Sequence, residues 1–181
     1  ESQVRIKEMF KGACLNGWTV VDQGPLLGPS NWSVVDGVLS QTTHIYSNPT
    51  APSTLRKEGT YIRFDAGSGW TDYEASCQVR SAGVNDCGVM FRIQDGSNYY
   101  RFNWNSQNQY SRLVKVVDGT ATLLASRPEG YVLDRDYQVK VVAFGSELRV
   151  YVDNVLWLSA ADSSFSSGTV GFYCWGDAPG A

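Results

Sequence analysis

The 181-residue sequence has little of what several functional classes require. Its 15 basic and 18 acidic side chains give a net charge of −3, which does not favour a nucleic-acid-binding surface. No run approaches the roughly 18 apolar residues of a membrane-spanning helix. The single histidine, His44, has no Ser or Cys nucleophile motif beside it, and no Gly-rich loop carries a phosphate-binding lysine. These absences argue against nucleic-acid binding, membrane insertion and histidine-dependent nucleophilic catalysis.

Cysteine is also scarce, with residues only at positions 14, 77, 87 and 174 and no CxxC pair that would indicate a zinc or redox site. If residues 81–83 form a three-residue hairpin loop, Cys77 lies directly opposite Cys87 with both sulfurs facing the core. We therefore predict a disulfide between Cys77 and Cys87, with two free buried thiols as the alternative. A bridge from Cys14 to Cys174 is also open, because it would tie the first strand to the last.

Aromatic residues and glycine are abundant: ten Tyr, seven Phe, six Trp and eighteen Gly. Aromatic residues fit pleated sheets and glycine fits turns, and no long stretch has helical periodicity. We predict an all-β fold, a single β-sandwich domain of two antiparallel sheets over residues 1–181. The expected strands are 17–21, 32–35, 38–41, 59–65, 73–80, 88–94, 99–104, 113–117, 122–125, 137–144, 148–152, 156–158 and 169–175.

Alternation along these runs predicts which side chains face the core. In "GVMFRIQDGSNYYRFNWN" (88–105), a loop at Asp95–Asn98 places Ile93 opposite Tyr100 on the core side and Arg92 opposite Arg101 on the other side. The predicted inward set is Ala75, Cys77, Val79, Phe91, Tyr100, Phe102, Val139, Val141, Leu148, Val150, Val152, Val170 and Phe172.

The outward side of the same strands carries side chains that suit a sugar. A sugar ring offers an apolar face and a fringe of hydroxyls, so its site needs an aromatic ring and planar polar groups. We predict a carbohydrate-binding surface made of Arg92, Gln94, Tyr99, Arg101, Asn103, Tyr151, Tyr173 and Trp175. The plain alternative is that the arginines pair with nearby carboxylates and keep one sheet solvated.

Several segments together resemble a known group: "GPSNWSVVDGVLSQ", "GVMFRIQDGSNYYRFNW", "RLVKVVDGTATLLAS", "LRVYVDNVLW" and "GTVGFYCWG". Over about residues 17–176 the chain is similar to laminin-G-like, concanavalin A-like lectin–glucanase jelly-roll modules attached to extracellular bacterial carbohydrate-active or surface proteins. The resemblance implies a two-sheet jelly roll, an extracellular or cell-surface location and often a structural calcium ion. Asp22 and Asp162 are the predicted calcium ligands, because they flank strands expected to be neighbours in this fold.

Catalysis is not expected. Glycoside hydrolysis usually needs a pair of carboxyl groups, and hydrolases of this superfamily carry them in a Glu-x-Asp-x-x-Glu motif that this sequence lacks. The pattern that comes nearest to this motif is a pair of acidic residues two positions apart, Asp134 and Asp136, and it falls in an expected loop. We therefore predict a non-catalytic carbohydrate-binding module that targets a polysaccharide within a larger multimodular protein. The alternatives are an adhesion or spacer domain of a cell-surface protein, and a glycoside hydrolase or lyase.

Overall fold

A computed structural model describes residues 10, 14–24, 28–46 and 55–176 of the chain. Within this part the chain forms strands joined by turns and one short 3-10 helix, Asp65–Gly67. No helix in the described residues has the length and hydropathy of a membrane span. The strands are β1 (Trp18–Asp22), β2 (Trp32–Val35), β3 (Val38–Gln41), β4 (Thr60–Phe64), β5 (Tyr73–Val79), β6 (Asp86–Asp95), β7 (Asn98–Asn105), β8 (Tyr110–Val117), β9 (Thr120–Arg127), β10 (Tyr137–Phe144), β11 (Glu147–Val152), β12 (Val155–Ala161) and β13 (Thr169–Trp175).

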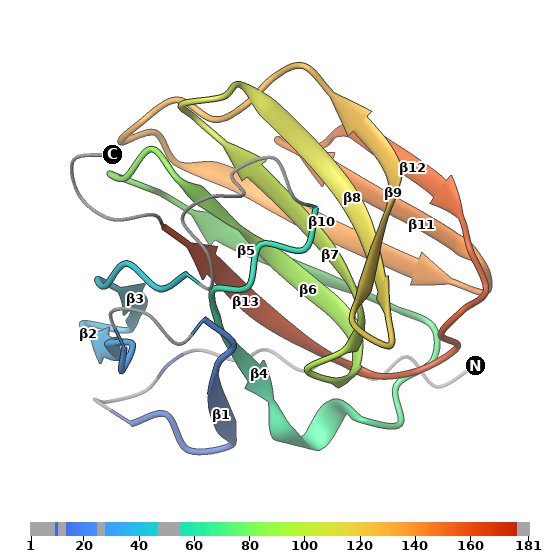
Figure 1. The fold of residues 1–181 in the computed structure, drawn as a ribbon, viewed down its shortest axis with the longest axis horizontal. Coiled ribbons are helices and arrows are strands. Elements are labelled where there is room, and N and C mark those ends of the chain that lie inside the picture. Colours follow the sequence, from blue (N-terminus) through green and yellow to red (C-terminus); the bar gives the residue numbers. More distant parts are fainter. Residues whose placement is uncertain (1–9, 11–13, 25–27, 47–54, 177–181) are drawn as a thin grey trace.

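Two antiparallel sheets make up the sandwich, with strands of both sheets running in similar directions across the view in Figure 1. The larger sheet has seven strands in the order β1-β4-β13-β6-β7-β8-β9, and the smaller has four in the order β12-β11-β10-β5. Strands β2 and β3 form a separate hairpin. The predicted all-β jelly-roll sandwich is confirmed, and each expected strand run has a counterpart in the structure.

Three of the tight turns use the residues that the sequence supplies for them. Asp36–Gly37, Asp118–Gly119 and Asp153–Asn154 each join two hairpin strands, and all six residues have positive φ, between 47° and 76°. Positive φ at both central residues defines the turn whose twist matches that of antiparallel strands, and Asp, Asn and Gly adopt it most easily. The short "VDG" and "VDN" motifs therefore fix the register of three hairpins.

The core between the sheets contains every residue of the predicted inward set, together with Trp104, Leu113, Tyr131 and Tyr137. Trp104 lies at one end of this core with Tyr137 4.8 Å and Tyr131 5.4 Å away, measured between ring centroids. Rings at these separations contribute roughly 0.5–1.5 kcal/mol per pair beyond the area they bury. The alternation rule is thus confirmed for the inter-sheet core.

The β6–β7 hairpin differs from the prediction, because the cross-strand pairs expected from simple alternation are not the ones observed. Arg101 pairs with Met90 and Tyr100 with Phe91, and the register shifts between Phe91 and Asp95. Arg92 has a φ of 46°, and its amide donates to the Tyr73 hydroxyl at 2.7 Å. This β-bulge turns Ile93 away from the inter-sheet core, so Arg92 and Arg101 are not opposite one another.

The disulfide predictions are not supported, because all four cysteines are free. The expected hairpin over residues 81–83 is wrong: β5 pairs with β10 in the small sheet, whereas β6 belongs to the large sheet. Cys77 and Cys87 therefore come from different layers. Cys87 instead lies opposite Cys174 of β13, and Cys14 is exposed. Burial raises the pKa of Cys77 and of Cys174 to about 12.

Candidate functional site

The side of the seven-stranded sheet that faces away from the small sheet, here called the outer face, has a polar end and an apolar end. The strand register places residues of successive strands side by side, and at the polar end these residues form two neighbouring rows across the sheet. One row runs Trp175, Asp86, Asn105 and Tyr110, and the next runs Tyr61, Tyr173, Gly88, Asn103, Arg112 and Ser126. Beyond them, Met90, Val114 and Val116 form the apolar end.

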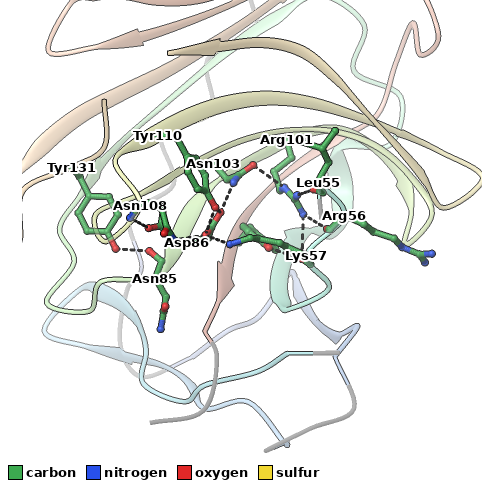
Figure 2. A network of polar contacts seen from close by, with 12 residues as sticks. Leu55, Arg56, Lys57, Asn85, Asp86, Arg101, Asn103, Asn108, Tyr110 and Tyr131 are labelled. Atoms are coloured by element: carbon green, nitrogen blue, oxygen red, sulfur yellow. Dashed lines mark hydrogen bonds and ion pairs between the residues drawn. The ribbon is translucent and has the colours of Figure 1, made fainter. Parts of the chain in front are cut away.

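Asp86 is the centre of the polar end. It is 2% exposed, and its carboxylate accepts hydrogen bonds from Lys57 (2.8 Å), Asn105 (2.7 Å), Asn103 and the Tyr110 hydroxyl (2.7 and 2.9 Å) (Figure 2). A buried carboxylate is stable only when paired and hydrogen-bonded, and these donors satisfy both of its oxygens. Asp86 thereby holds four side chains from three other segments in fixed positions.

Residues 55–58 form a segment that crosses the outer face (Figures 1 and 2). Arg101, fully buried, donates to the carbonyls of Leu55 (2.5 Å), Arg56 (2.8 Å) and Lys57 (3.4 Å). Its guanidinium also stacks 4.3 Å from the Tyr173 ring centroid. The segment is therefore held to the sheet by charge-assisted hydrogen bonds, and Arg101 has no donor left facing solvent.

Tyr110 and Arg112 form the accessible edge of this network. Both are half-buried, and the Arg112 guanidinium lies 3.8 Å from the centroid of the Tyr110 ring. Burial, and next the charge of Asp86, raise the pKa of Tyr110 well above its usual range, so its hydroxyl keeps its proton. A rigid aromatic ring and a planar cation are thus displayed together beside the 55–58 segment.

The prediction of a carbohydrate-binding surface that displays Arg92 and Arg101 is wrong in its geometry. Arg92 is 1% exposed and donates to the carbonyls of Thr71 (2.9 Å), Gly145 (2.7 Å) and Phe165 (2.9 Å), besides contacting the Asp72 carboxylate at 3.3 Å. It links three loops at one end of the sandwich. Both cations are satisfied inside the molecule, so neither is free to bind a ligand.

The other predicted sugar-binding residues are also separated or covered. Tyr99, Asn103, Tyr173 and Trp175 do lie on the outer face, but each is at most 5% exposed. Trp175 is covered by Lys57, whose Nζ lies 4.0 Å from the ring centroid.

Gln94 and Tyr151 lie away from these four residues. Tyr151 belongs to β11, in the small sheet, next to Lys140. Gln94 is exposed and lines an open cavity of about 360 Å³ with Asn98 and residues 164–167, where its amide donates to the Ser167 carbonyl.

The two predicted calcium ligands do not come together. Asp22 ends β1, at one edge of the large sheet, whereas Asp162 follows β12, the edge strand of the small sheet. Asp162 already accepts from Lys115 (2.5 Å) and from the Tyr100 hydroxyl (2.6 Å). Burial would raise the pKa of Asp162, but these two bonds outweigh it and hold the pKa well below its usual value.

The contacts of the two aspartates do not support a shared calcium site. At Asp162 the ammonium of Lys115 occupies the place of a cation, and Asp22 accepts from the Ser30 amide at 2.9 Å. Among the described residues, no group of three or more His, Cys, Asp or Glu side chains could hold a metal ion. The Asp22–Asp162 assignment is therefore wrong, and a calcium requirement stays a prediction.

Sequence reasoning missed Lys57, Asp86, Tyr110 and Arg112. A signal existed for Tyr110 and Arg112, because they alternate with the buried residues Ser111 and Leu113 on a strand that follows the recognised hairpin. Lys57 gave no such signal, since it lies in an irregular stretch between strands.

Comparison with known proteins gives two curated relatives and a similar solved structure. The chain is 25% identical over 149 residues to a levanase of Bacillus subtilis (strain 168), covering 81% of this chain and 21% of that protein. It is 28% identical over 134 residues to an extracellular exo-alpha-L-arabinofuranosidase of Streptomyces chartreusis, covering 72% of this chain and 14% of that protein. The chain thus spans about a fifth or less of the curated relatives it matches.

Among solved structures, the carbohydrate-binding module CBM66 from Bacillus subtilis has the same fold, with a TM-score of 0.67, 23% identity and 88% of each chain covered. This likeness agrees with the expected jelly-roll sandwich. The family model of the 3-keto-alpha-glucoside-1,2-lyase-like domain matches residues 5–179. The protein therefore belongs to the 3-keto-alpha-glucoside-1,2-lyase-like domain family.

Proposed function

We propose that this chain is a non-catalytic carbohydrate-binding module that binds a polysaccharide at the exposed edge of the Asp86 network. The observation that carries the proposal is the half-buried Arg112 guanidinium, 3.8 Å above a Tyr110 ring whose hydroxyl is fixed by Asp86. This edge replaces the surface predicted around Arg92, because it presents a cation and a ring that remain accessible.

The chemistry of this edge suits a sugar. A guanidinium presents several N–H donors in one plane, which match the spacing of vicinal hydroxyls. Stacking on Tyr110 restricts its rotamers, so less entropy is lost when a ligand binds. Asn108, exposed in the turn before β8, adds an amide beside the same edge (Figure 2). A small site of this kind should bind with about −4 to −8 kcal/mol, which is millimolar to micromolar affinity.

The relatives support the choice of ligand class. A levanase acts on levan and an arabinofuranosidase on arabinofuranosides, as their names state, and this chain matches only a minor part of each. A module of that extent would hold a larger extracellular enzyme on its polysaccharide. We therefore take levan and arabinan as the first ligands to test, and an extracellular location as part of the proposal.

The state of Asp86 supports a binding role over a catalytic one. A general base needs a lone pair that can reach substrate, whereas both oxygens of Asp86 accept bonds from protein donors. A glycosidase would also need a second carboxyl group roughly 5–10 Å away. The nearest acidic residue in the covering segment, Glu58, forms an ion pair with Arg56 at 2.5 Å.

The family description favours one second candidate, a lyase. Elimination requires a base that removes a proton next to a carbonyl group, so a lyase at this site would need Tyr110 to lose the proton that it donates to Asp86. Release of an unsaturated product from a 3-keto-glucoside would establish this candidate, and release of reducing sugar from levan or arabinan without unsaturation would indicate a hydrolase instead. The binding module predicts no turnover with any of them.

Affinity electrophoresis through gels containing levan or arabinan tests the binding proposal. Wild-type protein should be retarded in at least one gel, and Arg112→Ala should migrate as in a gel without polysaccharide. Arg149→Ala is the matched control, since Arg149 is a half-buried arginine on the small sheet. Equal retardation of wild type and Arg112→Ala would remove this site, and no retardation in any gel would favour an adhesion or spacer domain.

A further inference from the structure

The β6–β7 hairpin has an open cavity of about 360 Å³ at the end opposite Asp86. One wall of the cavity is the hairpin itself, and the other is the loop 162–168, which joins β12 to β13. The side chains that line it are Gln94, Asn98, Ser164, Phe165, Ser166 and Ser167. Small-molecule sites usually have volumes of roughly 300–1,000 Å³, so this cavity has room for one small ligand.

A distortion of β6 shapes the first wall. Arg92 has a left-handed φ of 46°, and the register with β7 is interrupted between Phe91 and Asp95. Such a backbone is costly for any residue except glycine and is most often found at functional sites, where a bulge redirects the side chains beside it. Here the interruption leaves Gln94 without a pairing partner in β7, and its amide donates to the Ser167 carbonyl across the cavity wall.

The second wall is held in place by side chains from the body of the sandwich. The buried guanidinium of Arg92 donates to the Phe165 carbonyl at 2.9 Å, and the Phe165 amide donates to the Tyr100 hydroxyl at 3.2 Å. The Asp162 carboxylate accepts from the Ser164 amide at 2.9 Å and from the Tyr100 hydroxyl at 2.6 Å. The loop therefore has a fixed shape before a ligand arrives, which lowers the entropy cost of binding.

The lining combines an aromatic ring with neutral polar groups. Phe165 is half-buried, and its ring packs edge-on against Tyr100 with 5.3 Å between the ring centroids, which fixes its orientation. The carboxamides of Gln94 and Asn98 and the serine hydroxyls can both donate and accept hydrogen bonds. An apolar face with a fringe of hydroxyls is what such a lining matches, and a sugar ring has that form.

The charges around the cavity favour a neutral ligand. No side chain that lines it carries a formal charge. Lys115 donates to the Ser164 hydroxyl at 3.0 Å, but it is paired with Asp162, and Asp95 accepts from the Asn98 amide at 3.1 Å. An ionic ligand would find no counter-charge among the lining residues, whereas a neutral sugar needs none.

Resting on the proposed saccharide-binding function, we infer that this cavity is a second sugar-binding site, which takes a neutral sugar residue of the same polysaccharide. Arg112 is level with Asn103 of β7, five residues from Asn98, so roughly 17 Å separates the two sites along the strand. A polymer can bridge that distance, and its second contact is intramolecular once the first has formed. Either site alone is weak, so loss of one removes most of the retention by polysaccharide.

Affinity electrophoresis over a series of levan or arabinan concentrations tests the inference, because it gives a dissociation constant for each variant. Ser166→Leu fills part of the cavity from an exposed position, so binding should weaken about tenfold or more while the melting temperature stays unchanged. Phe165→Leu removes the ring but keeps an apolar side chain, and it should weaken binding to a similar extent. Ser163→Leu is the matched control, since Ser163 is an exposed serine of the same loop that does not line the cavity.

The gels separate this inference from the proposed function. Weaker binding of both cavity variants, with Ser163→Leu equal to wild type, supports the inference. Binding of either cavity variant as tight as that of wild type, or an equal loss in Ser163→Leu, overturns it, while Arg112→Ala still decides the proposed function. Retardation by polygalacturonate but not by levan or arabinan overturns the choice of a neutral sugar. No retardation of wild type in any gel overturns both proposals.

Discussion

Arg101→Ala should destabilise the fold strongly, although Arg101 sits on a strand face that sequence alternation assigns to solvent. Its side chain is 0% exposed and donates to three carbonyls of the 55–58 segment and to the Asn103 side chain at 3.2 Å. Truncation removes these donors and leaves the carbonyls facing a vacated space. It also removes the cation that stacks on Tyr173.

The magnitude follows from these contacts. Hydrogen bonds that involve a charged group contribute about 1.5–3 kcal/mol each, and water entry with movement of the segment recovers part of the loss. We expect a net decrease in the free energy of unfolding of about 3–5 kcal/mol, which is typical when one partner of a buried ionic group is removed. For a protein of this size that corresponds to a fall in melting temperature of roughly 6–20 °C.

Urea unfolding and thermal unfolding, both followed by circular dichroism, measure the effect. Arg112→Ala is the matched control, because Arg112 is a half-buried arginine on the same face and should cost less than about 1 kcal/mol. If Arg101→Ala unfolds at the same temperature and urea concentration as wild type, Arg101 does not hold the 55–58 segment. The structural role that replaces its predicted sugar-binding role would then be refuted.

Two further predictions concern ionisable groups. Since its folded-state pKa is lowered, Asp162 stabilises the protein above its unfolded pKa, about 4, and this contribution is lost as pH falls further. Asp162→Asn should therefore cost more stability in urea at about pH 7 than at about pH 3, and an equal cost at both would contradict the Lys115 pairing. In native protein at about pH 8, only the exposed Cys14 should react with a thiol reagent, because burial raises the pKa of Cys77 and Cys174 to about 12. Rapid reaction of more than one thiol before unfolding would contradict that burial.

The sequence predicted the fold well because the fold depends on local signals. Alternation identified the inter-sheet core, and Asp-Gly and Asp-Asn pairs located the hairpin turns. The register error in the β6–β7 hairpin arose around Arg92, whose backbone is left-handed, because β6 carries two more residues than β7 between the pairs Phe91–Tyr100 and Asp95–Asn98. An arginine with positive φ has no sequence signature, since its conformation is imposed by Tyr73 and the neighbouring loops.

The site was harder to predict because it depends on contacts between distant segments. Alternation correctly placed Arg101, Asn103 and Tyr173 on the outer face, but it could not indicate that residues 55–58 cross that face and cover them. Lys57 reaches Asp86 across 29 sequence positions from an irregular stretch. Pattern therefore gives the face of a side chain, whereas its exposure depends on what lies above it.

The central claim is that the outer face of the seven-stranded sheet binds a polysaccharide at the edge formed by Tyr110 and Arg112. Amide chemical-shift mapping during titration with levan or arabinan oligosaccharides tests it most directly. We expect the largest shifts around Tyr110 and Arg112 on β8, with little change at Tyr151 on β11. Shifts confined to the four-stranded sheet, or none with any oligosaccharide, would contradict the claim.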